Sequence, residues 1–411
     1  MILEPQISSA GPDEDRPASP RDQRRTMSVA LPVHALHDGY SDVVYVMLPI
    51  WQAEFALSYA AVGLLRSTLS GTMAAFQIPA GLLAERIGGA AVLAAGTALA
   101  GLCFCLIGWS SGYAFIAAAL LLAGIGSSAQ HPIGSALVAR AFAGPRSLAA
   151  IGTYNFSGDI GKVLFPAAAT LLMLFLPWRV TLAVLGTVGM AAATAIFLLL
   201  PRFAAPSPAT GPRNAEHRVF RGSERTGFPL LLSVGMIDNA TRTAFLTFLP
   251  FLLRAKGAEL PTIGLALTLA FIGGAAGKLV CTFVGLRIGV LATVILTETL
   301  TALGILALLP LPLTAALPII PLVGVALSGT SSVLYGSVAH LVAPAARTRA
   351  FAVFYTGTIG CGALAPFAYG FVSDALGIAV TIAVIAAVAL LTLPLAAALR
   401  GPLRQASEAG I

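Results

Sequence analysis

The sequence predicts an all-helical integral membrane protein with twelve transmembrane helices, arranged as two pseudo-symmetric bundles of six. Three observations support this fold class. Of the 411 residues, 57% are hydrophobic and only 10% are charged, whereas a soluble domain carries about 25% charged residues. Apolar stretches of roughly 20 residues, the length that crosses a bilayer as a helix, recur along almost the whole chain. Several residues also recur at one constant spacing along the sequence.

The hydropathy pattern places six spans in each half of the chain. The first half has spans at 28-52, 59-84, 90-109, 113-141, 147-173 and 178-200. The second half has spans at 227-254, 260-285, 290-309, 315-342, 347-372 and 377-400. We expect a disordered tail at 1-27, a flexible linker at 201-226 and a second tail at 401-411. The linker is rich in proline and arginine and poor in apolar residues, which is typical of a solvated segment.

The constant spacing of 201 residues indicates an internal repeat. The pairs that show it are Pro49 and Pro250, Gly63 and Gly264, Arg86 and Arg287, and Gly88 and Gly289. Six spans separate the two copies, and because six is even, both copies run the same way through the membrane. The repeat therefore predicts two bundles related by an axis along the membrane normal, which rock around a central cavity.

The basic residues predict the orientation of the chain. With twelve spans both termini lie on one side, and 17 arginines fall in the tails, the linker and the loops of that side. The opposite loops hold only Arg179, Arg254 and Lys256. The positive-inside rule then predicts a multi-pass protein of the inner (cytoplasmic) membrane with both termini in the cytoplasm. Because the net charge of +7 is spread between apolar segments, we expect no nucleic acid as a partner.

Ionisable side chains inside a span are costly and indicate function by default. The first span holds His34, Asp38 and Asp42, spaced four residues apart on one helical face. We predict that these three residues couple transport to protons. In this hypothesis Asp38 carries the proton and Asp42 shares it as a like-charged neighbour. His34 either relays the proton or, when charged, lowers the affinity of the two aspartates for it.

A second set of polar residues in the spans is predicted to contact a transported solute. The set is Gln130, His131, Asn155, Asp159, Lys162, Asp238, Arg242, Lys278 and Tyr335. Asp38, Asp159 and Asp238 each lie roughly 14 to 18 Å from the cytoplasmic ends of their helices at about 1.5 Å per residue, near mid-membrane. The first, fourth, fifth, seventh, eighth and tenth spans should therefore line the cavity.

Structural interpretations compete with these roles. Asp238 and Arg242 could form a mutually neutralised pair, Asp159 could pair with Lys162, and His131 could be a packed, hydrogen-bonded histidine. Glu298 lies in a span that we expect to be peripheral, which favours a structural or interface role. Arg66 is expected either to snorkel to the interface or to gate the cavity.

Catalytic and cofactor chemistry is not expected. The four cysteines lie in apolar segments without metal-ligand spacing, so neither a metal nor a cofactor is predicted. Gly161-Lys162 and Gly277-Lys278 resemble a phosphate-binding loop but lack its other residues and lie inside spans. Gly273 and Gly277 suit close helix packing instead. No nucleophile or catalytic constellation is present, so the chain is not predicted to be an enzyme.

The turn after the second span carries a recognisable motif. The stretch Gly81-Leu82-Leu83-Ala84-Glu85-Arg86-Ile87-Gly88 resembles the signature GxLaDRxGrr of the major facilitator superfamily, and the second half keeps Arg287 and Gly289 of it. This resemblance implies the twelve-helix major facilitator fold and transport by alternating access. It also implies that these motif residues control the change of conformation. Glu85 replaces the usual aspartate of the motif.

A narrower resemblance involves the first and fourth spans. His34 with Asp38, and the run from Gly124 to Pro132, resemble the fosmidomycin-resistance branch of that superfamily, which is associated with proton-linked drug efflux. The fifth span departs from this branch by carrying Asp159 and Lys162, and the GPxxGG pattern of drug antiporters is absent from the sequence.

Three functional hypotheses follow. The first is proton-coupled export of a small organic solute, and the alternative is proton-coupled uptake of an anionic metabolite with Lys162, Lys278 and Arg242 as counter-charges. The third is a membrane sensor that binds without transporting. The expected partners are a small-molecule substrate, protons and the lipid bilayer, with the chain acting as a monomer.

Overall fold

The computed structural model describes residues 19–142, 146–201, 223–342 and 347–403, and all regular secondary structure in these ranges is α-helical. The first bundle contains α1 (Pro20–Phe55), α2 (Tyr59–Ile87), α3 (Gly89–Ile107), α4 (Tyr113–Ser127), α5 (Gln130–Ala141), α6 (Arg146–Leu172) and α7 (Trp178–Leu199). The second contains α8 (Ser223–Ala255), α9 (Leu260–Ile288), α10 (Val290–Ala307), α11 (Leu313–Ala316), α12 (Ile320–Leu341), α13 (Arg347–Leu376), α14 (Ile378–Ala389) and α15 (Thr392–Ala398).

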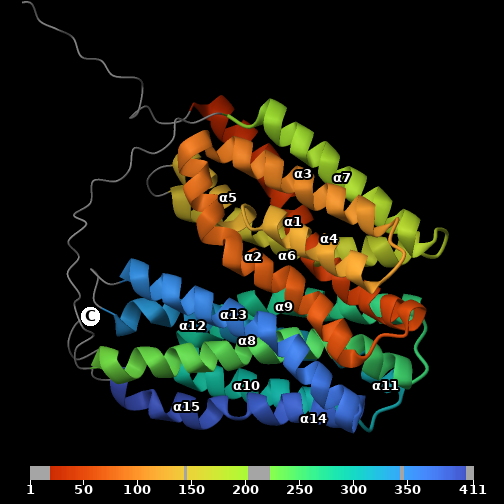
Figure 1. Cartoon of the computed structure of the whole chain (residues 1–411). Coiled ribbons are helices and arrows are strands. Elements are labelled where there is room, and N and C mark those ends of the chain that lie inside the picture. The colour runs from red at the N-terminus through yellow and green to blue at the C-terminus, as the bar shows by residue number, and fades with distance from the viewer. Residues whose placement is uncertain (1–18, 143–145, 202–222, 343–346, 404–411) are drawn as a thin grey trace, which may run out of the picture.

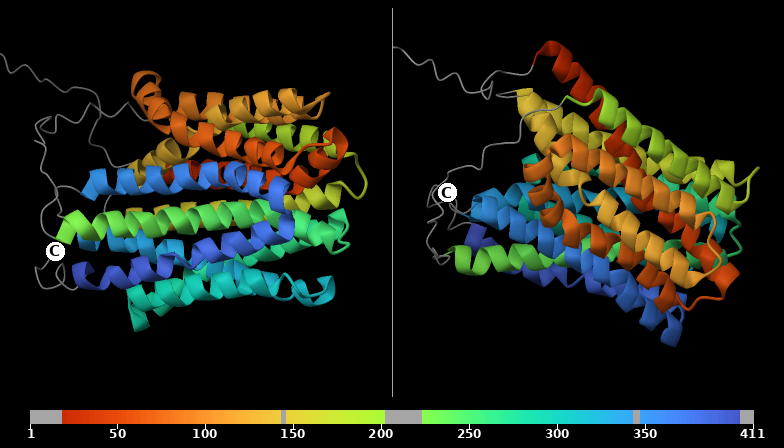
Figure 2. Two further views of the ribbon diagram at one scale, coloured as in Figure 1. Left: turned by 60° about the horizontal axis from the view of Figure 1, so that its bottom comes forward. Right: turned by 45° about the horizontal axis from the view of Figure 1, so that its top comes forward.

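The two bundles lie side by side, and the long helices within each bundle run roughly alongside one another (Figures 1 and 2). Eight helical segments among the described residues are long and apolar enough to cross a membrane by length and composition. Of the remaining long helices, α1, α6 and α8 carry most of the buried ionisable side chains. The predicted fold class, an all-helical membrane protein of two six-helix bundles, is confirmed.

Proline explains where predicted spans are interrupted. The span at 113-141 divides into α4 and α5 because Pro132 has no N–H to bond the carbonyl of Ser128. The span at 315-342 begins as the short α11 and resumes at Ile320, next to Pro321. The span at 377-400 divides into α14 and α15 just before Pro394. Figure 1 shows α14 and α15 in line along the bundle.

The first helix begins earlier than predicted. α1 starts at Pro20, so residues 20–27 are helical rather than part of a disordered tail. Ser19 explains the start, because its hydroxyl accepts a hydrogen bond from the backbone N–H of Asp22 at 3.2 Å, and Pro20 fits the first helical position. The rest of the predicted tail, most of the linker (202–222) and residues 404–411 lie outside the described residues.

The internal repeat has a structural counterpart. Helices α2 and α9 are both 29 residues long, and their bounds are displaced by the same 201 residues as the sequence motifs. Gly88 and Gly289 end these helices with φ of 92° and 84°, a region that glycine adopts without the penalty other residues meet. The repeated glycines therefore serve the same turn in both halves.

The two bundles touch through two equivalent helix pairs. α2 of the first bundle packs on α13 of the second, and α9 of the second packs on α6 of the first. A Cβ added at Gly63 would collide with the backbone carbonyl of Pro366, and one added at Gly264 would collide with Thr170. The repeated glycines Gly63 and Gly264 thus allow the closest approach between bundles.

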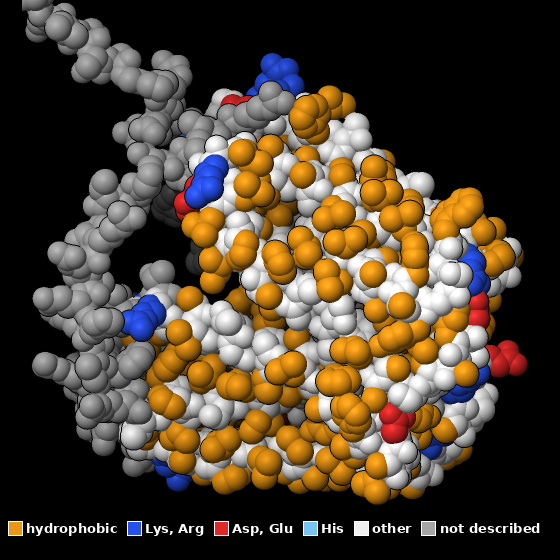
Figure 3. Space-filling view, viewed as in Figure 1, with side chains coloured by type: hydrophobic (Ala, Val, Ile, Leu, Met, Phe, Trp, Pro, Cys, Tyr) orange, Lys and Arg blue, Asp and Glu red, His pale blue; other side chains and the backbone are white. Residues whose placement is uncertain are grey.

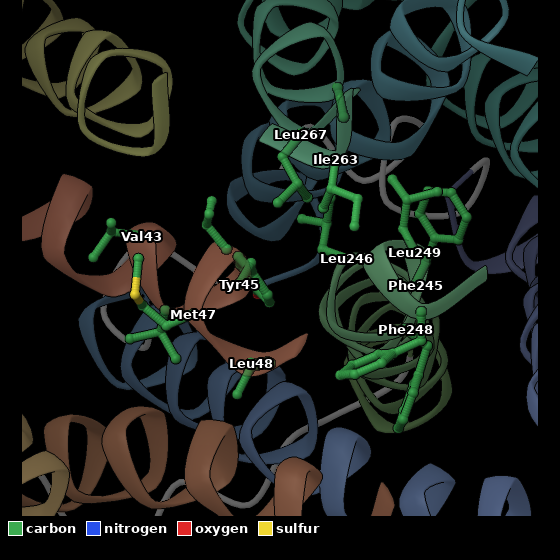
Figure 4. Packing of buried hydrophobic residues seen from close by; sticks show 14 of the residues in the cluster. Val43, Tyr45, Met47, Leu48, Phe245, Leu246, Phe248, Leu249, Ile263 and Leu267 are labelled. Carbon is green, nitrogen blue, oxygen red and sulfur yellow. The ribbon is translucent and has the colours of Figure 1, made fainter. Parts of the chain in front are cut away.

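Contact between the bundles is concentrated at one end, which we call the closed end: the end where α1 passes into α2 and α13 into α14. One hydrophobic cluster there joins α1, α8 and α9, and Figure 4 shows Met47, Phe248 and Ile263 within it. At the opposite, terminal end, where the described chain starts and stops, each bundle has its own separate clusters. Figure 3 shows the surface notched between the bundles at that end.

Polar bonds reinforce the closed end. The carboxylate of Asp374 at the end of α13 accepts hydrogen bonds from the backbone N–H groups of Tyr59 (2.6 Å) and Ala60 (2.9 Å) at the start of α2. Arg254 of α8 donates to the carbonyl of Pro49 in α1 at 3.0 Å. Asp374 therefore caps a helix of the opposite bundle, where a negative charge is also favoured by the helix dipole.

We expect Asp374→Asn to weaken the closed end, because the substitution removes the charge that caps α2. Asparagine keeps one accepting oxygen, so the loss is that of the second acceptor and of the charge at the helix N-terminus, about 1 kcal/mol, which corresponds to roughly a fivefold lower population of this conformation. Spin labels at the closed ends of α2 and α13 would measure the shift as a larger share of long distances. Glu259→Gln is the matched control, since Glu259 precedes α9 at the position equivalent to Ser58 and makes no side-chain cap bond. An unchanged distance distribution in Asp374→Asn would contradict the capping role.

Candidate functional site

Four charged side chains form a chain of contacts that passes from one bundle to the other. Asp38 Oδ2 on α1 lies 3.3 Å from Lys162 Nζ on α6, and Lys162 Nζ lies 3.7 Å from Asp159 Oδ1. Lys278 Nζ on α9 lies 2.5 Å from the same Asp159 oxygen. The predicted pairing of Asp159 with Lys162 within α6 is confirmed. Sequence reasoning did not predict that Lys278 of the other bundle completes the chain.

Glycines on α6 make this arrangement possible. A Cβ added at Gly158 would collide with the Asp38 carboxylate, and one added at Gly161 would collide with the backbone of Ala35 on α1. Both positions are buried between α1 and α6, so only glycine lets the two backbones approach. Gly161 beside Lys162 is therefore a packing residue. On the other bundle Gly273 and Gly277 pack against the backbone of α12, as the sequence predicted.

Two histidines surround the other oxygen of Asp38. His34 Nε2 lies 3.6 Å and His131 Nε2 lies 3.7 Å from Asp38 Oδ1. The Nδ1 of His34 is 2.8 Å from the backbone carbonyl of Tyr154, whose ring stacks on the imidazole at a centroid distance of 4.1 Å. When Nδ1 donates to that carbonyl, Nε2 carries the lone pair and faces the carboxylate, where it can accept a proton.

Gln130 has a different position from the one predicted. It is 1% exposed and donates from Nε2 to the hydroxyl of Tyr154 at 2.9 Å. Since Tyr154 in turn stacks on His34, Gln130 lies behind the histidine and orients it rather than facing a solute. Neighbouring His131 is the more open residue, with 28% of its side chain exposed. His37, one turn from His34, is held by Thr97 and Ser127, which indicates a structural role.

Asp42 and Arg66 form a separate contact. Arg66 Nη2 lies 3.9 Å from Asp42 Oδ1 and donates to the hydroxyl of Tyr45 at 2.9 Å. Its guanidinium also lies over the ring of Tyr45, and Nη1 bonds Ser70. Arg66 is 6% exposed, so it does not snorkel to the interface. Because Asp42 faces Arg66 while Asp38 faces Lys162, the direct proton sharing predicted between the two aspartates is not the arrangement in this conformation.

The second bundle contributes Arg242, Asp238 and Tyr335. The described residues contain no ion pair between Asp238 and Arg242, so the predicted mutual pair is not formed here. Asp238 is buried, with 5% of its surface exposed. Arg242 is half-buried and has no ion-pair partner among the described residues. Tyr335 packs edge-on against Phe354, and Asn155 is exposed one turn before Asp159.

The residues of the conformational motif lie at the terminal end of the bundles. Gly81, Glu85, Arg86 and Gly88 occupy the last turns of α2 and its cap, and Arg287 and Gly289 occupy the same positions of α9. The side chains of Glu85, Arg86 and Arg287 are exposed. In this conformation the bundles are apart at that end, so the role of the motif in conformational change stays a prediction.

One group of side chains has the geometry of a metal site. The donor atoms of His34, Asp38 and His131 all lie within 4.8 Å of one another. The ammonium of Lys162, however, is 3.3 Å from the Asp38 carboxylate and already supplies the positive charge that a metal ion would bring. The donor set therefore does not fit a resident metal ion while Lys162 is charged, and the absence of a metal stays a prediction.

Exposure shows which groups a solute could reach. Lys162 and Lys278 keep 34% and 33% of their side chains exposed, whereas Asp38 and Asp159 keep 11%. These positions lie midway along their helices, so the exposed ammonium groups face the space between the bundles. The site therefore presents cations to a ligand and keeps the carboxylates behind them. Such an arrangement can bind a negatively charged or strongly polar group.

Several residues of the site escaped sequence reasoning. Tyr154 and Tyr45 orient charged groups through their rings and hydroxyls, but an isolated tyrosine in an apolar span gives no signal of that role. The sequence around Asp374 gives no sign that it caps a helix, because the residues it bonds precede it by more than 300 positions. Glycines 158 and 161 on α6 were a usable signal, since two small residues so close together indicate a tight helix contact.

Comparisons with known proteins agree with this geometry. The family model described as Major Facilitator Superfamily matches residues 31–237 and 231–410. No curated protein matches the chain. A bacterial homolog of the human lysosomal transporter Spinster, solved inward-facing and occupied, aligns with a TM-score of 0.71 at 16% identity, covering 95% of this chain and 98% of its own.

A mutant form of the nucleoside transporter NupG aligns with a TM-score of 0.78 at 13% identity, covering 92% of this chain and 99% of its own. The Spinster homolog in an inward-facing, unoccupied conformation aligns with a TM-score of 0.67 at 17% identity, covering 95% and 98%. At these identities the solved structures show the shared fold, and the family match covers nearly the whole sequence. The chain belongs to the major facilitator superfamily of membrane transporters.

Proposed function

We propose that this transporter is a proton-coupled exporter of a small organic solute and that the solute is anionic. In this proposal it acts as a monomer in the inner membrane, with both termini and the linker in the cytoplasm, as the distribution of arginine suggests. The proposed relation to the fosmidomycin-resistance branch rests on His34, Asp38 and the glycine-rich stretch that ends at Pro132. The closed end then faces away from the cytoplasm.

The observation that carries the proposal is the charge chain from Asp38 to Lys278. Lys162 lies between the carboxylates of Asp38 and Asp159, and Lys278 shares Asp159, so a change of charge on Asp38 can pass through Lys162 and Asp159 to Lys278. When Asp38 takes up a proton, Lys162 loses one of its two counter-charges. It is then drawn toward Asp159, where it competes with Lys278 of the other bundle. Protonation of Asp38 would thereby weaken the ion pair that joins the bundles.

The sign of the local charge supports an anionic solute. The site contains the carboxylates of Asp38, Asp42 and Asp159, which face Lys162, Lys278 and Arg66. Arg242 remains as a cation without an ion-pair partner among the described residues. Because an uncompensated charge at this depth is costly, a bound anion that pairs with Arg242 would be stabilised. The same observation favours the second candidate, proton-coupled uptake of an anionic metabolite.

Asp38→Asn tests the coupling. The amide keeps the shape of the side chain but cannot take up a proton, so we expect uphill transport driven by a pH gradient to be lost. Solute exchange and binding should remain. Ligands are first identified by a thermal-shift screen of metabolites and antibiotics, and transport is then measured in proteoliposomes. Glu259→Gln is the control, because Glu259 is an acid that precedes α9 and lies outside the site. Uphill transport at the wild-type rate in Asp38→Asn would refute the coupling role.

Comparing Lys162→Ala with Lys278→Ala tests the charge chain. Removal of Lys162 leaves Asp38 without its lysine, whereas removal of Lys278 leaves Asp159 still paired with Lys162. We expect Lys162→Ala to lose about 2 kcal/mol of stability, below the roughly 3–5 kcal/mol of a fully buried pair because Lys162 is partly exposed. Lys278→Ala should lose less stability but should favour separation of the bundles. Equal thermal stability of wild type and Lys162→Ala would contradict the stabilising role of Lys162 between Asp38 and Asp159.

Arg242→Gln tests the anionic solute. We expect at least tenfold weaker binding of an anionic ligand found in the screen, with little change for a neutral ligand, because the glutamine keeps hydrogen bonding but not charge. Calorimetry of the purified protein measures both affinities. Counterflow in both membrane orientations then separates export from uptake. Equal loss of affinity for neutral and anionic ligands would show that Arg242 acts through structure.

A further inference from the structure

We propose that Asn239 of α8 is a specificity-determining residue of the transport site, where it hydrogen-bonds an uncharged polar group that the anionic solute carries beside its acid group. The inference rests on the proposed function, in which Arg242, one turn along α8, pairs with the solute anion. It goes further by naming the class of solute: an anion with a hydroxyl, carbonyl or amide group a few bonds from the acid group.

The internal repeat makes Asn239 the counterpart of Asp38. Asp38 precedes Pro49 in α1 by the same number of residues as Asn239 precedes Pro250 in α8, and the two prolines belong to the 201-residue repeat. Two positions that are related by an axis between the bundles lie at the same depth and on the same side of their helices. Asn239 therefore occupies in the second bundle the place that Asp38 occupies in the first.

Helix packing around the two positions is also alike. α1 packs on α6, and α8 packs on α13. A Cβ added at Gly158 of α6 would collide with the Asp38 carboxylate, and one added at Gly362 of α13 would collide with the amide oxygen of Asn239. In each bundle a glycine of the neighbouring helix thus leaves room for the polar side chain. The fold accommodates the carboxamide of Asn239 in the way it accommodates the carboxylate of Asp38.

The second copy of this arrangement lacks the charged partners of the first. His34, one turn before Asp38 on α1, has Gly235 as its counterpart on α8. α6 contributes a lysine to Asp38, whereas the middle of α13, from 350 to 373, has no charged residue. A carboxylate at position 239 would therefore lack the histidine and the lysine that accompany Asp38, and it would be costly at this depth. The repeat places a titratable group in one bundle and the neutral amide of Asn239 in the other.

The carboxamide of Asn239 is available to a solute. Asn239 is half-buried, and its side chain makes no hydrogen bond within the described part of the chain. The adjacent hydroxyl of Thr243 donates to the backbone carbonyls of Asn239 (2.9 Å) and Gly362 (2.8 Å), so helix packing here uses the backbone and not the carboxamide. An amide both donates and accepts, so it can bind a hydroxyl, carbonyl or amide group.

The spacing of Asn239 and Arg242 relates the two contacts to one solute. Residues three apart on a helix are neighbours, with Cβ atoms roughly 5–6 Å from each other. Arg242 is half-buried as well, and no ion pair is formed by it among the described residues. A solute whose acid group pairs with Arg242 therefore brings its neighbouring atoms to Asn239.

Charged thiol reagents test whether Asn239 faces an anion-attracting space. The four native cysteines of the full-length protein are replaced by alanine, Asn239→Cys is added, and reaction rates are measured with methanethiosulfonate reagents that carry either a sulfonate or a trimethylammonium group. Ser233→Cys is the control, because Ser233 is a half-buried position of α8 about 9 Å nearer the terminal end.

We expect the ratio of anionic to cationic reaction rates to be roughly threefold or more higher in Asn239→Cys than in Ser233→Cys, because Arg242 attracts the sulfonate. Adding Arg242→Gln should abolish this difference. An equal ratio at the two positions, or an Asn239→Cys that stays unreactive while Ser233→Cys reacts, would overturn the proposal.

Pairs of anions that differ by one hydroxyl test the specificity in a background with native cysteines. Lactate and propionate form one pair, and malate and succinate form the other; calorimetry measures their binding to wild type, Asn239→Leu and Arg242→Gln. We expect wild type to bind the hydroxylated member of at least one pair about fivefold or more tightly. Asn239→Leu should still bind both members but without that preference, whereas Arg242→Gln should lose affinity for both.

The outcomes separate this inference from the function on which it rests. A wild type without any preference, or an Asn239→Leu that keeps the preference, would overturn the role of Asn239 and leave the pairing of the anion with Arg242 intact. Affinities that Arg242→Gln leaves unchanged for both members would instead overturn the anionic solute itself, and the role of Asn239 with it.

Discussion

The ion pair between Asp159 of α6 and Lys278 of α9 is the contact on which the arrangement of the site depends, because it is the point where buried charges of the two bundles meet. Each charge would be costly alone at this depth, so each needs the other bundle to supply part of its neutralisation. Lys162 extends the pair to Asp38 on α1. The bundles are therefore linked by charge near the middle and by apolar packing at the closed end.

This linkage depends on small residues at defined positions. Gly158 and Gly161 bring α6 against α1, and Gly264 brings α9 against α6, so both acids and both lysines come within contact distance. Larger side chains would separate the helices and leave the charges unpaired. Close packing and charge neutralisation are thus two parts of one constraint, which a single substitution on α6 would disturb together.

The two bundles use their acids differently. In the first bundle Asp38 has lysine and histidine partners and faces the space between the bundles, so its protonation can alter contacts across that space. In the second bundle Asp238 and Glu298 are buried, with 5% and 1% of their surface exposed, and neither forms an ion pair with a lysine or arginine among the described residues. The pseudo-symmetric fold therefore carries an asymmetric set of charges.

The sequence alone determined the fold class, the repeat and the helices that carry charge, because hydropathy, spacing and the cost of ions in lipid are local properties of the chain. It also predicted the pairing of Asp159 with Lys162, which are three residues apart on one helix. Only the tertiary structure decided that Asp42 faces Arg66, that Asp238 forms no ion pair with Arg242, and that Lys278 completes the chain. These partners lie on different helices, and the rotation and approach of each helix depend on packing that no sequence spacing specifies.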